Sequence, residues 1–238
     1  MQKETSITAA GQLPGTGPAQ TKRSKHYQAQ DKEIAELITA ARQLIARFVS
    51  SEDIAEKMAK NGYNAERLEE GRALCDHLQD CYTGRQVLMG NRMQLSAELK
   101  KKDNELCKHF SDFRVFARVL FKDPDDRRKL GVTGRRSRDR QRVLTTITSA
   151  VAAALEEPFR ETFSRHGYGS EQLAALLEEV EALRTLDNKQ DLAEILAKEA
   201  TGIRDEAASE LRQWVSGFRS IAKRVLRDNP DWGSIVDL

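Results

Sequence analysis

Apolar side chains recur every three or four positions along this sequence from about residue 31 onward. That spacing places them on one face of an α-helix, because 3.6 residues make one turn. Proline, which interrupts helices, is nearly absent from the same region, and two stretches of nearly 60 residues contain none. The pattern therefore predicts an all-α protein with long helices.

The apolar pattern occurs twice along the chain, at an offset of 105 residues. Landmark residues recur in one register without a gap: Gly62-Tyr63 as Gly167-Tyr168, and Phe113-Arg114 as Phe218-Arg219. Such matches indicate an internal repeat. Because both copies must bury their amphipathic stripes, we expect an internally duplicated antiparallel helical bundle with long helices and pseudo-two-fold symmetry.

The same pattern sets the expected domain organisation. Residues 1–28 contain glycine, proline and polar side chains with few bulky apolar ones, so they are expected to form a disordered tail. Helical repeat 1 is expected at 29–132, a basic junction at 133–142 and helical repeat 2 at 143–238. The two repeats are expected to pack together as one domain.

Each repeat is expected to begin with a helix, at 31–49 in the first copy and at 139–156 in the second. A short helix follows and stops at Gly62 or Gly167, where glycine can take the left-handed conformation that closes a helix. The sequence leaves two alternatives open for what comes after.

The segments 65–122 and 170–227 are either single very long helices or hairpins of two helices. Gly84, Gly90 and Gly202 are weak candidates for a turn and do not align with one another in the repeat. A hairpin or a marked kink is the favoured alternative.

Several of these motifs are shared with a known group of proteins. They are a Gly-Tyr step before a leucine-containing helix, a Phe-Arg-x-x-Ala helix that ends in Asp-Pro, and the junction Leu130–Arg136. With them the sequence resembles uncharacterised bacterial tandem-repeat helical-bundle proteins over about residues 30–238. The resemblance implies an all-α duplicated fold and brings no activity, substrate or catalytic residue. The chain departs from the group's pattern at Trp232–Ile235.

Positive charge is concentrated in the segment 127–142, which carries +7 while the whole chain carries only +2. Its possible polyanion-binding residues are Arg127, Arg128, Lys129, Arg135, Arg136, Arg138, Arg140 and Arg142. Guanidinium groups bind phosphates well, but the segment lacks the interleaved aromatic residues of single-strand binding proteins. A solvated linker, or an internal partner for the acidic helices, is therefore favoured over nucleic acid.

Cysteine and histidine provide a candidate zinc site. His77 and Cys81 are four residues apart on one helical face, and Cys107 and His109 could approach from another segment. The corresponding positions of the second repeat are mostly apolar, which favours core packing over metal binding. The sequence has no Glu-x-x-His pair and no phosphate-binding loop, so no catalytic, metal or cofactor-binding residue is assigned and no cofactor is expected.

The favoured function is a non-enzymatic interaction or scaffolding module, with a protein partner or self-association. One alternative is an accessory protein that binds a polyanion or nucleic acid through the basic junction. Another is a metal-binding protein or enzyme that uses the cysteine and histidine residues.

A cytoplasmic location is expected from two features. The longest apolar run, Ala150–Leu155, is far shorter than the roughly 20 residues that a membrane-spanning helix requires, so no membrane contact is expected. The three cysteines are an odd and sparse set, which suits unpaired thiols in a reducing compartment.

Overall fold

The computed structural model describes residues 18–134, 137 and 139–227, and this part of the chain is helical with no strand. Its helices are α1 (Pro18–Val49), α2 (Glu52–Lys60), α3 (Ala65–Leu120), α4 (Pro124–Lys129), α5 (Arg140–Ala154), α6 (Phe159–Arg165) and α7 (Ser170–Val225). The expected all-α bundle of long helices is confirmed. None of these helices combines the length and the apolar character that crossing a membrane requires.

The two long segments are continuous helices, α3 and α7, each of 56 residues. The favoured hairpin, with a turn at Gly84, Gly90 or Gly202, is therefore wrong. A helical glycine costs only about 1 kcal/mol relative to alanine, and no proline removes a backbone donor. The large apolar side chains beside these glycines, Val87, Met93 and Ile203, are exposed, so the helix propensity of the flanking residues, rather than core packing, offsets this cost.

The first helix begins earlier than the sequence suggests. α1 starts at Pro18, so residues 18–28 of the expected disordered tail are helical, while residues 1–17 lie outside the described part of the chain. Proline suits the first position of a helix, because its missing N–H would have no helical partner there. The helix extends through alanine, glutamine and lysine residues, which have good helix propensity.

The short helices α2 and α6 end as expected. Gly62 and Gly167 have φ angles of +91° and +79°, in the left-handed region. Beyond each glycine, the N–H of a tyrosine donates to a carbonyl five residues back, from Tyr63 to Met58 at 2.9 Å and from Tyr168 to Phe163 at 3.0 Å. These bonds close the helix and turn the chain into the following long helix.

The bounds of α3 and α7 correspond at the offset of 105 residues: Ala65 to Ser170, and Leu120 to Val225. Equal bounds are what an internal duplication predicts. The duplication and its symmetry stay predictions.

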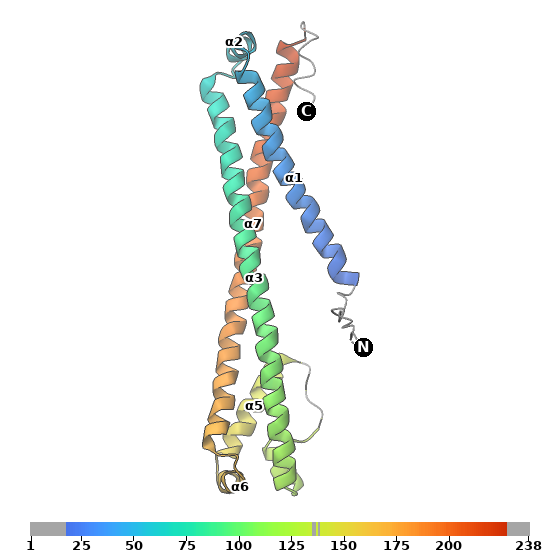
Figure 1. Ribbon diagram of the computed structural model, residues 1–238, viewed down its shortest axis with the longest axis vertical. Helices are drawn as coiled ribbons and strands as arrows, with labels where there is room; N and C mark the ends of the chain where they lie inside the picture. The colour runs from blue at the N-terminus through green and yellow to red at the C-terminus, as the bar shows by residue number, and fades with distance from the viewer. Residues whose placement is uncertain (1–17, 135–136, 138, 228–238) are drawn as a thin grey trace, which may run out of the picture. The chain divides into compact units, whose positions relative to one another are not determined.

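The described residues form two compact units that do not coincide with the two sequence repeats. Unit 1 combines residues 18–82 with 203–227, and unit 2 is Thr83–Gly202. In unit 1, α1 and α2 lie beside the start of α3 and the end of α7 (Figure 1). In unit 2, α4, α5 and α6 accompany the end of α3 and the start of α7.

The core of unit 1 is built around an aromatic group. The rings of Phe48 and Tyr63 meet Phe218 edge to face at centroid distances of 4.7 and 4.9 Å, and Trp214 stacks on Phe218 at 5.2 Å. These contacts join α1 and the turn before α3 to α7. Edge-to-face and offset-stacked pairs are the favourable geometries for aromatic rings.

Two ion pairs hold α1 in place within unit 1. Arg42 contacts Asp76 of α3 at 2.7 Å, and Asp31 lies 3.5 Å from Arg204 of α7. The Arg204 side chain is only 1% exposed, and its guanidinium also bonds Asp205 at 2.5 Å. This buried guanidinium therefore links α1 to α7, beside the apolar contacts of α1 with the core.

In unit 2, α3 and α7 run antiparallel. Arg85 donates to the hydroxyl of Thr201 at 3.2 Å, and further along α3 His109 contacts Glu179 at 2.8 Å. Phe110 and Phe113 of α3, and Phe121 just after its end, are buried.

Gly71→Ala tests how closely α3 and α7 approach in unit 1. A Cβ at residue 71 would lie 2.5 Å from Cη2 of Trp214 and 2.7 Å from its Cε2. Trp214 is buried and stacked, so it cannot move aside without repacking the core. We expect the free energy of unfolding to fall by about 1–3 kcal/mol, measured by urea denaturation followed by circular dichroism.

Gly90→Ala is the matched control in the same helix. A Cβ at residue 90 would meet nothing within 4 Å, so only helix propensity changes. The free energy of unfolding should rise by about 0.5–1 kcal/mol. Equal stability of the two variants would contradict the close approach at Trp214.

Arg204→Ala should lower the free energy of unfolding by about 3 kcal/mol or more, because it leaves Asp31 without this partner and opens a cavity at a fully buried position. Arg204→Met keeps an apolar stem of similar length and should recover part of the loss. Urea denaturation of both variants measures the difference. A loss below about 1 kcal/mol in the alanine variant would show that this pair is not a main constraint on α1.

Candidate anion-binding cleft

The chain turns sharply after α3 because α4 is tied back onto its end. The carboxylate of Asp123 caps α4 by accepting from the N–H groups of Asp125 at 2.7 Å and Asp126 at 3.2 Å. The guanidinium of Arg127 then donates to the carbonyls of Phe121 at 2.7 Å and Arg118 at 2.8 Å. Carbonyls at a helix C-terminus lack helical partners, so Arg127 satisfies the end of α3.

The segment that follows α4 is held against α3 by two arginines of that helix. Arg118 donates from Nε to the carbonyl of Val132 at 2.8 Å, and Arg114 donates to the carbonyl of Gly134 at 2.7 Å. Leu130 and Val132 are buried at 0% and 1% exposure and anchor the segment from below. This attachment leaves a space between the segment, α3 and α5.

That space is a cleft of about 560 Å³ in unit 2. Its described lining comes from α3, the segment 131–137 and the first turns of α5: Phe110, Arg114, Gly131, Thr133, Ser137, Gln141, Arg142, Val143, Thr145 and Thr146. The lining has two arginines, four hydroxyls and one amide, and none of these residues is acidic. The cleft is therefore cationic and rich in hydrogen-bonding groups.

Arg142 is the cationic residue of the cleft whose side chain is available to bind a ligand. Its backbone N–H donates to the N-cap Asp139 at 3.1 Å, while its exposed side chain forms no ion pair with another described residue. Arg114 contributes a second positive charge, although it also holds the Gly134 carbonyl. A guanidinium presents paired N–H donors that match phosphate and carboxylate oxygens.

The hydroxyl groups of the cleft differ in what they can offer. Thr145 and Thr146 donate their protons to the carbonyls one turn back, Gln141 at 2.9 Å and Arg142 at 2.8 Å, so they act as acceptors toward a ligand. Ser137 accepts from the Asp139 N–H at 3.0 Å, so its own O–H can donate. The cleft therefore offers donors at Arg142 and Ser137 and acceptors on α5.

An apolar wall faces these polar groups. Phe110 is 1% exposed and Val143 is 6% exposed, and both line the cleft. A site with an apolar wall and a few polar groups is typical of small-molecule binding. The arrangement suits a ligand with an anionic group at one end and an apolar body at the other.

Three of the basic residues singled out from the sequence serve the fold. Arg127 caps α3, Arg128 pairs with Asp125 one turn away at 2.9 Å, and Arg140 contacts Asp187 of α7 at 2.6 Å. Arg140 also lies 3.8 Å from Asp103 of α3. Of these contacts, only those of Arg140 pair the segment with acidic side chains of the long helices.

The other basic residues of the segment have different surroundings. Lys129 is exposed at the end of α4, and Arg142 lines the cleft. Arg135, Arg136 and Arg138 lie outside the described residues.

The polar lining of α5 was not identified from the sequence. Thr145 and Thr146 lie three and four residues after Arg142, which places all three on one helical face. That spacing is the signal that could have identified them. Thr133, Ser137 and Gln141 carry no comparable pattern.

The cysteine and histidine residues of the proposed zinc set belong to different units. In unit 1, the Cys81 sulfur lies 3.7 Å from Nε2 of His77. In unit 2, His109 contacts Glu179, and Cys107 is buried. Among the described residues, no three cysteine, histidine or acidic side chains gather where they could hold a metal ion.

The thiols of unit 1 should react slowly. Burial is the main cause that raises the pKa of Cys75 and of Cys81, and nearby Asp80 raises that of Cys81 further. Because the thiolate is the nucleophile, we expect iodoacetamide at pH 7.5 to alkylate both cysteines more slowly in the folded chain than in the urea-unfolded chain. Mass spectrometry of peptides measures the rates. A folded-state rate for Cys81 that levels off below pH 8 would instead indicate an activated thiol.

No protein-family model matches the sequence, and no curated protein or solved structure matches the chain at a significant level. The resemblance to bacterial tandem-repeat helical-bundle proteins stays a prediction.

Proposed function

We propose that this chain is a non-enzymatic binding protein that takes an organic anion into the cleft of unit 2. The observation that carries the proposal is a lining with two arginines, hydroxyl groups and no described acidic residue. The volume of about 560 Å³ is within the usual range for small-molecule sites.

The proposed ligand is a small molecule with a phosphate or carboxylate group and a flat apolar body. Arg142 and Ser137 supply donors for the anionic group, and the body would lie over the buried residues Phe110 and Val143 at the base of the cleft. Charge-assisted hydrogen bonds from a guanidinium are about twice as strong as neutral ones. The anionic group is therefore expected to contribute most to recognition.

A binding role without catalysis is supported by the chemistry of the lining. The described lining residues include no histidine, carboxylate or cysteine, the groups that most often transfer protons or act as nucleophiles. The raised thiol pKa values of Cys75 and Cys81 argue against a reactive cysteine in unit 1.

The test compares two variants that remove the same charge from the same basic segment. Arg142→Gln changes the cleft, whereas Lys129→Gln changes an exposed residue that does not line it. Adenosine monophosphate serves as the probe because it joins a phosphate to a flat base. In isothermal titration calorimetry, we expect Arg142→Gln to weaken binding about tenfold or more and Lys129→Gln to change it less than about twofold.

Two further titrations separate the parts of the ligand. Adenosine lacks the anionic group and inorganic phosphate lacks the apolar body, so each should bind more weakly than the nucleotide. If neither the nucleotide nor phosphate shows binding that depends on Arg142 at millimolar concentration, the proposal is wrong.

Polyanion binding along the whole basic segment gives a different result. Its affinity for a single-stranded oligonucleotide would fall steeply with salt, and Arg142→Gln and Lys129→Gln would weaken it alike. Replacing Arg135, Arg136 and Arg138 with alanine would then remove binding to heparin. That outcome would replace the cleft with an extended nucleic-acid surface.

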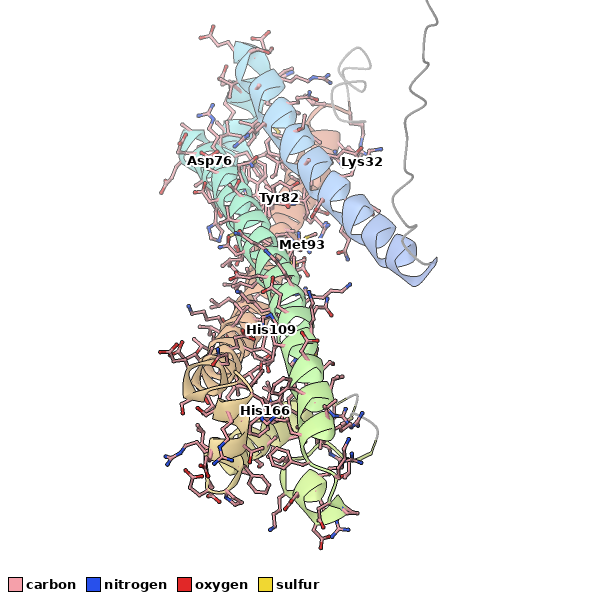
Figure 2. All side chains as sticks on the ribbon, turned by 60° about the horizontal axis from the view of Figure 1, so that its bottom comes forward. Lys32, Asp76, Tyr82, Met93, His109 and His166 are labelled. Atoms are coloured by element: carbon pink, nitrogen blue, oxygen red, sulfur yellow. The ribbon has the colours of Figure 1, made fainter. Side chains whose placement is uncertain are left out.

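An interaction or scaffolding role, through a protein partner or self-association, is the second candidate function. It is favoured by large apolar side chains that unit 2 exposes on its long helices: Val87 and Met93 on α3, and Leu192, Ile195 and Leu196 on α7. Figure 2 labels Met93 on α3. Exposed apolar surface of this kind marks interaction sites. The proposal includes a cytoplasmic location, which the three free thiols support.

A further inference from the structure

The middle of α7 carries an apolar stripe that no described helix of unit 2 covers. Leu192, Ile195 and Leu196 are 56%, 52% and 39% exposed. The first residue of α5, Arg140, pairs with Asp187 at 2.6 Å, so α5 reaches α7 only as far as this level. Beyond it, α7 presents the stripe to solvent.

Four exposed residues of α7 form one line, which we call the α7 seam: Lys189, Leu192, Leu196 and Glu199. Their spacings of three, four and three residues keep them within an arc of about 80° on the helix. The same alternation of three and four positions makes the contact line of paired helices. Ala197, which is 1% exposed, faces inward on another side of the helix.

The residues of the α7 seam are spaced symmetrically about its centre. The two leucines occupy equivalent positions, and the two charged residues at the ends have opposite signs. Reading in one direction gives a cation, two leucines and an anion, and reading in the other gives an anion, two leucines and a cation. Lys189 and Glu199 form no ion pair with any residue in the described part of the chain. Their neighbours Glu194 and Lys198, by contrast, pair with each other at 2.9 Å.

We propose that the α7 seam binds the α7 seam of a second copy of this chain, with the two helices antiparallel. This inference rests on the interaction role given as the second candidate function and names its partner. In this arrangement Leu192 of each copy meets Leu196 of the other, and Lys189 of each copy meets Glu199 of the other. Both contacts occur twice, as two-fold symmetry of a dimer requires.

Charge selects the antiparallel arrangement. Parallel pairing in register would place lysine against lysine and glutamate against glutamate, which is unfavourable across an interface. Antiparallel pairing removes both repulsions and turns them into attractions. The leucines alone would permit either direction.

The experiment uses the full chain in sedimentation velocity over a range of concentrations. The wild type should approach twice the monomer mass of 26.9 kDa as concentration rises. Lys189→Glu and Glu199→Lys should each weaken the dimer about tenfold or more, because each places two like-charge pairs in the interface. Circular dichroism checks that both variants keep their helix content.

Mixing the two single variants provides the sharpest test. One carries glutamate at both ends of the seam and the other carries lysine at both ends, so a mixed dimer has two attractive pairs. The mixture should regain the affinity that each variant loses alone. The double variant Lys189→Glu/Glu199→Lys should also regain it.

Two substitutions of exposed apolar residues locate the contact. Leu192→Glu should abolish the dimer, whereas Val115→Glu, at a position on α3 that is 62% exposed, should leave it unchanged. A dimer that survives Leu192→Glu would overturn the α7 seam while leaving the interaction role standing. A wild type that stays monomeric at every concentration would overturn self-association, and a mixture that fails to recover would overturn the antiparallel register.

Discussion

Close antiparallel packing of α3 on α7 is the contact on which the rest of each unit depends. In unit 1, the absence of a side chain at Gly71 lets the ring of Trp214 lie against α3, and Trp214 in turn stacks on Phe218. In unit 2 the same two helices pass one another over many turns, from Arg85 opposite Thr201 to His109 opposite Glu179. The shorter helices pack onto this pair within each unit (Figure 1). Their positions follow from the pair because their apolar faces have no other surface to cover.

The cleft results from the way one connection is tied to this pair. Arginine guanidinium groups form most of the ties, and their targets are main-chain carbonyls rather than carboxylates: Arg127 on the end of α3, and Arg114 and Arg118 on the segment after α4. Each such bond satisfies a carbonyl outside regular helix bonding, which a buried connection requires. Most of the arginines of this region therefore stabilise the fold. Arg142 differs from these residues because its side chain faces the cleft and no described acid neutralises it.

Local signals in the sequence were sufficient for the helix ends and for much of the core. Gly62 and Gly167 close helices because a left-handed residue is needed at those points, and Phe113 is buried because its spacing places it on the apolar face. The continuity of α3 could not be predicted, since a glycine such as Gly90 is compatible with a turn and with a helix interior alike. The cleft was missed for a related reason. Its walls come from α3, a connection and α5, and no sequence spacing reports that residues so far apart meet.

The segments of the chain that make up each unit affect the order in which the units can fold. Unit 2 is continuous in sequence, so all of its residues are available once Gly202 has left the ribosome. Unit 1 joins residues near the start of the described chain to residues after 203, and Phe48 meets Phe218 across most of the sequence. Closing so long a loop costs more chain entropy than closing local contacts, and folding rates fall as contacts become less local. During synthesis the apolar side chains of α1 and α2 that pack against α7 therefore stay exposed until the end of α7 has been made.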